Sequence, residues 1–110
     1  MARSLDLLQG TLDPLVLKAL SWGPRHGYAV ASWLRETTGD RITIEDGALY
    51  TSLHRMEHRG WLTASWGVTE NNRKAKYYTL TARGRSELAL AEGRWAQYAE
   101  AVSLVLGAKR

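Results

Sequence analysis

The fold is decided by residues 46–80, which have the sequence DGALYTSLHRMEHRGWLTASWGVTENNRKAKYYTL. In the first part of this stretch apolar residues recur at helical spacing, at Leu49, Leu53 and Met56, and Gly60 stands where such a helix would end. After Gly60 the pattern changes to an alternation with a period of two. The stretch therefore predicts one helix followed directly by strands.

Two strands are predicted at residues 61–66 and 76–80, where aromatic and β-branched residues are frequent. The polar segment 67–75 separates them, and its Asn-Asn pair tolerates the positive φ angle of a turn. We expect these strands to form a β-hairpin with a basic loop. The cations at the end of the loop are Arg73, Lys74 and Lys76.

Two more helices are predicted upstream. In the first, Asp13 is the expected N-cap and Pro14 the first helical residue, and the helix should end before the next Gly-Pro pair. The second should extend from about Gly27 to Thr38, with Gly39 as a left-handed cap. Both helices are short and closely linked.

The remaining segments complete the order of elements. Residues 41–44 are long enough only for a connecting strand, and Asp46 is the expected N-cap of the third helix. Thr81 is the expected cap of a last helix from about Ala82 to Leu106, which is long for so small a domain.

Three short helices, a hairpin with a basic loop and a further helix are typical of a winged helix-turn-helix, in which the third helix enters the major groove of DNA. We therefore predict a mainly α fold with a small β-hairpin. Residues 1–81 should form the winged helix-turn-helix DNA-binding domain, and residues 82–110 a long C-terminal dimerisation helix. A chain of 110 residues allows only one core.

The positive charge is concentrated in the middle of the chain. Residues 1–45 contain five basic residues (Lys or Arg) and five acidic residues (Asp or Glu). Residues 46–85 contain seven basic and three acidic residues, and residues 86–110 contain three of each. The whole net charge of +4 therefore falls in residues 46–85. Such a segment inside a folded domain favours a polyanionic partner, most often nucleic acid. The alternative interpretation is a solvated charged face.

The outward face of the third helix is predicted to contact double-stranded DNA. This face mixes donors, acceptors and cations and contains no acidic residue, as recognition of base edges and phosphates requires. An ordinary surface helix would usually interleave acids with bases. The predicted contacts on this helix are Gly47, Thr51, His54, Arg55 and His58, and Arg73, Lys74 and Lys76 of the hairpin should contact phosphates.

The last helix carries an apolar seam with heptad spacing, which predicts a homodimer. A helix of about 25 residues spans about 37 Å, more than its own domain can cover. A dimer would also match the symmetry of a palindromic operator. The residues of the seam are Leu88, Ala91, Trp95, Tyr98, Val102 and Val105.

Several function classes are excluded by what the sequence lacks. The chain contains no cysteine, no phosphate-binding glycine loop and no hydrolase or metalloprotease motif, so no enzyme activity and no cofactor are expected. His54 and His58 have a spacing that could hold a metal ion, but a third ligand is missing and no metal is expected. The chain has no secretory signal and no apolar run long enough to span a membrane, which favours the cytoplasm.

Beyond the element order, a succession of short motifs resembles the PadR family of bacterial transcriptional regulators, and specifically its short-tailed branch. The similarity extends over residues 8–106. The motifs are Leu8-Gln9-Gly10-Thr11-Leu12, Leu17-Lys18-Ala19-Leu20, His26-Gly27-Tyr28, Gly47-Ala48-Leu49-Tyr50, Leu53-His54-Arg55-Met56-Glu57, Arg59-Gly60-Trp61, residues 73–81 and Gly84-Arg85.

The resemblance implies a dimeric repressor that pairs through its last helix and N-terminal segment. It also implies that operator affinity falls when a small molecule, often aromatic, binds or when another input acts. Tyr50 corresponds to a DNA backbone contact of the family. Thr51 stands where members of the family commonly have Pro, so the resemblance implies no role for Thr51. Trp95 is similar to a Trp that lines an effector pocket in some relatives, and its spacing suits an interface core equally well.

Two alternatives share part of this pattern. A ligand-sensing or protein-interaction module would use the same dimer with little sequence-specific DNA binding, and would not need an acid-free face on the third helix. An RNA or architectural binder would need only the cations.

Overall fold

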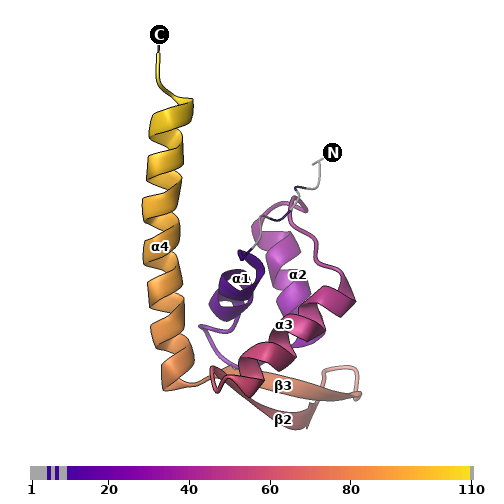
Figure 1. Cartoon of the computed structure of the whole chain (residues 1–110). Coiled ribbons are helices and arrows are strands. Elements are labelled where there is room, and N and C mark those ends of the chain that lie inside the picture. Colours follow the sequence, from indigo (N-terminus) through magenta and orange to yellow (C-terminus); the bar gives the residue numbers. More distant parts are fainter. Residues whose placement is uncertain (1–4, 6, 8–9, 110) are drawn as a thin grey trace.

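The computed structural model describes residues 5, 7 and 10–109 and contains four helices and three strands over that part of the chain (Figure 1). The helices are α1 (Leu12–Ala19), α2 (Gly27–Thr37), α3 (Asp46–His58) and α4 (Ala82–Leu106). The strands are β1 (Arg25–His26), β2 (Leu62–Val68) and β3 (Lys74–Leu80). The predicted mainly α winged helix-turn-helix with a long C-terminal helix is confirmed. The start of the predicted domain 1–81, and residues 8–9 of the first motif, lie outside the described residues.

The core lies between the three short helices and the sheet. Leu49, Leu53 and Met56 of α3 are buried, which confirms the predicted inner face of this helix. They pack in one cluster with apolar residues of α1 and α2 and with Leu62 and Tyr78 of the hairpin. Burial of this face orients α3 so that its opposite side lies at the surface.

The sheet has the order β1-β3-β2, and all its pairs are antiparallel. The predicted hairpin is present, with strands longer than predicted and a loop of residues 69–73. In this loop Asn72 has φ of 58°, as expected for the Asn-Asn pair. Sequence periodicity missed β1, because two residues are too few to show an alternation. The predicted connecting strand at residues 41–44 is wrong, since that segment is irregular.

Two predicted helix caps are wrong by one or two residues. α1 begins at Leu12 with Thr11 as its N-cap and ends at Ala19, so Asp13 and Pro14 lie inside its first turn. α3 has Glu45 as its N-cap, and Asp46 is its first helical residue. In both cases the acidic residue still lies in the first turn, where the helix dipole favours a negative charge.

The other predicted caps are confirmed. α2 begins at Gly27 and is followed by Gly39 with φ of 60°, and Nδ1 of His26 accepts a hydrogen bond of 3.2 Å from the Ala29 N–H. Thr81 caps α4, because its Oγ1 accepts a hydrogen bond of 3.0 Å from the Gly84 N–H.

The first turn of α4 is fixed tightly to the winged-helix domain. A Cβ atom on Gly84 would lie 2.2 Å from the carbonyl oxygen of Trp61, so only glycine fits there. The Thr81 hydroxyl also donates to the Gly60 carbonyl oxygen at 2.8 Å. These contacts hold the beginning of the helix against the turn between α3 and β2.

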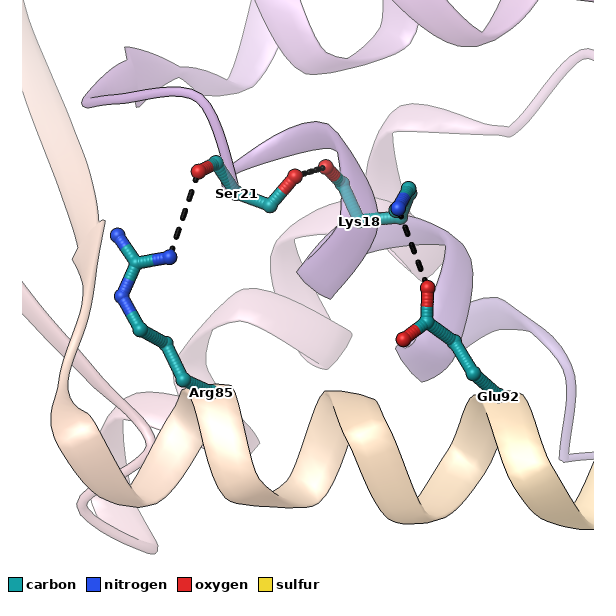
Figure 2. A network of polar contacts seen from close by, with 4 residues as sticks. All are labelled: Lys18, Ser21, Arg85 and Glu92. Atoms are coloured by element: carbon teal, nitrogen blue, oxygen red, sulfur yellow. Dashed lines mark hydrogen bonds and ion pairs between the residues drawn. The ribbon is translucent and has the colours of Figure 1, made fainter.

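A second set of contacts joins α4 to α1 (Figure 2). Lys18 Nζ lies 3.1 Å from Glu92 Oε2, and the Arg85 guanidinium donates to the Ser21 carbonyl oxygen at 3.4 Å. Ser21 in turn donates from Oγ to the Lys18 carbonyl oxygen at 2.7 Å. After these contacts α4 continues away from the domain, so its second half projects past α1 (Figure 1).

Candidate nucleic-acid interface

α3 presents most of the predicted DNA contacts at the surface. Its helical turns bring them to the side opposite the buried residues, within reach of one groove. Five of them are exposed, namely Gly47, Tyr50, Thr51, His54 and His58. Arg55 differs, because it is half-buried.

Arg55 is held by a contact between α3 and α1 that the sequence analysis did not anticipate. Its guanidinium forms an ion pair with the Asp13 carboxylate, with Nε 3.3 Å from Oδ2. The buried Ser52 hydroxyl donates to the same carboxylate at 2.6 Å. Asp13 therefore braces two helices instead of capping one. Spacing along the chain could not reveal this, since the partners are 39 and 42 residues apart.

Tyr50 lies on the side of α3 that faces the beginning of α2. A Cβ atom on Gly27 would come within 2.7 Å of the Tyr50 hydroxyl, so glycine makes room for the phenol. The ring centroid of Tyr50 is 6.4 Å from that of His54. Two predicted contacts, Tyr50 and His54, thus lie side by side on one edge of the helix.

The wing, defined as β2, β3 and the loop between them, places its three predicted cations differently. Lys76 Nζ lies 3.2 Å from Glu57 Oε1, and the hydrogen bond to this carboxylate raises the pKa of Lys76. Arg73 and Lys74 are exposed at the loop, and no carboxylate pairs with either of them in the described part of the chain. Arg73 and Lys74 are therefore the wing cations available to a phosphate.

The wing, β1, α2 and one edge of α3 border an open hollow of about 1200 Å³. We call it the α3–wing hollow. Tyr50, His54, Arg73 and Lys74 line it, so the structure brings predicted residues of both elements to one surface. Two exposed aromatic residues that the sequence analysis missed, Tyr28 and Trp66, also line it.

The seam of α4 divides into two parts. Leu88 and Ala91 are buried against the chain itself, whereas Trp95 is 52% exposed and Tyr98 and Val105 are also exposed; Val102 is half-buried. Trp95 and Tyr98 border a second groove of about 1050 Å³, together with residues of α1 and of the N-terminal segment.

Two further findings concern other kinds of site. Among the described residues no three His, Cys, Asp or Glu side chains gather closely enough to hold a metal ion, and His54 and His58 have no third partner there. None of the described helices is both long enough and apolar enough to cross a bilayer.

Comparison with known proteins agrees with this architecture. The model of the transcriptional regulator PadR-like family matches residues 16–90. A padr family transcriptional regulator from Eggerthella lenta is 32% identical, with a TM-score of 0.78, and the match covers 92% of this chain and 86% of that one. A transcriptional regulator from Clostridium thermocellum has a TM-score of 0.79 at 23% identity, over 86% of this chain and 92% of that one. An uncharacterised protein from Lysinibacillus sphaericus is 28% identical over 106 residues, 96% of each chain.

Proposed function

Because the chain belongs to the PadR-like family of transcriptional regulators, we propose that it is a homodimeric repressor that binds a palindromic operator in the bacterial cytoplasm. In this proposal residues 1–81 bind double-stranded DNA and residues 82–110 form the dimer. A small aromatic molecule, or another signal, releases the repressor from the operator.

One observation carries the DNA-binding part of the proposal. Tyr50 and His54 of α3 line the same hollow as the wing cations Arg73 and Lys74, which pair with no carboxylate of the described residues. A helix in the major groove with cations beside it meets base edges and flanking phosphates at the same time. Glu57 does not oppose this face, since it is paired with Lys76, whereas Glu36 and Glu70 also line the hollow.

The dimer is supported by the apolar residues that the chain leaves uncovered on α4. Trp95 and Tyr98 lie beyond Leu88 and Ala91 on the same seam and are exposed to solvent. Exposed large aromatic side chains at heptad spacing favour a second helix as their partner.

The groove beside Trp95 and Tyr98 supports the effector part of the proposal. Its lining is mostly apolar, with Leu15 from α1 and Leu5 and Leu7 from the N-terminal segment. Apolar and aromatic walls with few polar groups suit a planar aromatic molecule. The same groove would also accept a side chain from a second copy of α4.

The proposal is tested by selecting genomic DNA fragments that the protein retains and by mapping its footprint on them. We expect enrichment of a short inverted repeat and a footprint with two-fold symmetry, with a dimer in sedimentation. Enrichment without a common sequence would indicate an architectural binder, and no enrichment would indicate an interaction module.

A further inference from the structure

The apolar face of the wing continues past the hydrophobic core. Residues paired across the strands lie on the same face of the sheet. Near the core, Leu62 of β2 and Tyr78 of β3 are buried on the face that packs against the helices. Farther along β2, Trp66 and Val68 lie on this same face but are 66% and 63% exposed. Trp66 and Val68 are thus uncovered where the core ends.

The strand that carries Trp66 is supported from its other face. The Tyr77 ring lies against Gly67, where a Cβ atom would be 2.9 Å from two ring carbons. The Tyr77 hydroxyl donates to the Val68 carbonyl oxygen at 3.3 Å, and the His26 ring meets the Tyr77 ring edge-on at 5.3 Å. This support holds the Trp66 backbone in place before any partner binds, which lowers the entropic cost of binding.

Trp66 faces the α3–wing hollow in the company of a cation. It lines this hollow with Tyr50 and His54 of α3. Lys74 Nζ lies 5.6 Å from the centroid of the Trp66 ring, on the strand next to it. A partner that contacts this edge of α3 would therefore also contact the indole of Trp66 and the neighbouring ammonium of Lys74.

We propose that Trp66 packs against a deoxyribose of the DNA backbone that flanks the groove occupied by α3, while Lys74 contacts an adjacent phosphate. This inference rests on the proposed function. In the DNA backbone an apolar sugar alternates with an anionic phosphate. The indole of Trp66 suits the sugar, and the neighbouring ammonium of Lys74 suits the phosphate. An apolar protein partner would instead leave Lys74 and Arg73 against an uncharged surface, at a desolvation cost.

The chain offers a matched control for this contact. Trp22 is 63% exposed and has Lys18 Nζ 5.4 Å from its ring, but it does not line the α3–wing hollow. Trp22→Leu and Trp66→Leu therefore each remove an exposed indole beside a lysine, and Trp22→Leu also removes a contact with the Trp33 ring, whose centroid is 5.3 Å away. Only Trp66→Leu removes an indole from the proposed DNA surface.

The test measures binding of mixed-sequence duplex DNA, roughly three helical turns long, by fluorescence anisotropy over a series of salt concentrations. We expect Trp66→Leu to weaken binding about tenfold at every salt concentration with an unchanged slope, since no charge is removed. Trp66→Phe should recover most of this loss, and Trp22→Leu should bind like the wild type.

If Trp66→Leu binds duplex DNA as tightly as the wild type, the inference is wrong. It is also wrong if Trp22→Leu weakens binding as much as Trp66→Leu does. Neither result would contradict the proposed function. A wild-type protein that binds no duplex would defeat the proposed function itself, and the inference with it. Thermal melts of the variants should match the wild type, because both side chains are exposed. A lower melting temperature for Trp66→Leu alone would show that the indole stabilises the wing, and would also overturn the inference.

Discussion

At the scale of single residues, the cations of the wing are distinguished by their partners. Lys76 is paired with Glu57, whereas the Lys74 ammonium lies over the ring of Trp66 and pairs with no carboxylate of the described residues. An ammonium that is already neutralised releases fewer counterions from DNA when it binds. The three wing cations, which the sequence presents as equivalent, should therefore contribute unequally.

We predict that Lys74→Ala weakens binding to all DNA sequences about equally and reduces the salt slope by about one unit. Lys76→Ala should reduce the slope by less, since the Lys76 ammonium is already neutralised by Glu57. Anisotropy titrations over a salt series measure both slopes. Lys109→Ala, at the far end of the chain, is the control, and equal slopes for Lys74→Ala and Lys109→Ala would contradict the role of the wing.

His54 and Arg55 are neighbours on α3 whose substitution should have different results. His54→Ala should lower the ratio of specific to nonspecific affinity by about 1 to 3 kcal/mol, since the exposed imidazole has only a ring contact to Tyr50 in the described structure. Arg55→Ala should also destabilise the fold, by about 1 kcal/mol, because it leaves Asp13 without its cation.

Competition binding and thermal melts of these two variants separate the effects. A loss of about 1 kcal/mol lowers the melting temperature of a domain of this size by roughly 4 to 8 °C. If His54→Ala lowers the melting temperature as well, its side chain stabilises the fold, and the assignment of this edge of α3 to DNA would be wrong.

At the scale of helices and strands, α4 contains two glycines with opposite surroundings. Gly84 lies against the carbonyl oxygen of Trp61, whereas a Cβ atom on Gly93 would have no atom within 4 Å. Gly84→Ala forces backbone apart and should destabilise the fold by about 1 to 3 kcal/mol. Gly93→Ala should stabilise it by up to about 1 kcal/mol, through helix propensity.

Urea unfolding of the two variants, at one protein concentration, gives both free energies of unfolding. Each variant is the control of the other, because the chemical change is identical. A destabilising Gly93→Ala would show that a second molecule lies closely against that side of α4 and that the seam is placed on the wrong face.

The sequence predicts long elements well and local contacts poorly. The periodicity of α3 and the cap at Thr81 were sufficient to place α3 and the beginning of α4. β1 and the brace from Asp13 to Arg55 were missed, since each depends on residues that only the folded chain brings together. Trp66 could have been found, because it continues the alternation of Leu62 and Ala64 on β2 beyond the length that the core can cover.

At the scale of the whole molecule, Trp95 should matter more for the stability of the proposed dimer than for the stability of the folded chain. Its side chain is about half exposed, so Trp95→Ala should leave the folded domain intact. If a second copy buries the indole, the loss of apolar contact would cost up to about 3 to 5 kcal/mol and shift the dimer toward monomer at micromolar concentration.

Sedimentation and ligand titration of Trp95→Ala distinguish two roles for this residue. If Trp95 instead lines an effector cavity, the variant should remain dimeric and lose the quenching of tryptophan fluorescence by planar aromatic compounds. Trp22→Ala is the control, because Trp22 is also exposed but lies outside the seam. A variant that dimerises and responds to ligands normally would contradict both roles.

The glycine contact at the beginning of α4 also has a mechanical consequence. α4 is fixed to the winged-helix domain from Thr81 to Glu92 and then continues for 14 residues, to Leu106, past α1 (Figure 1). That arm is about 21 Å long, so a rotation of about 10° at its fixed end moves its tip by roughly 4 Å. Since one base pair of DNA rises about 3.4 Å, a tilt of this size is about one base-pair step. In a dimer joined through these arms, the angle between α4 and its domain, which the contacts at Gly84 and Glu92 fix, would set the spacing between the two copies of α3.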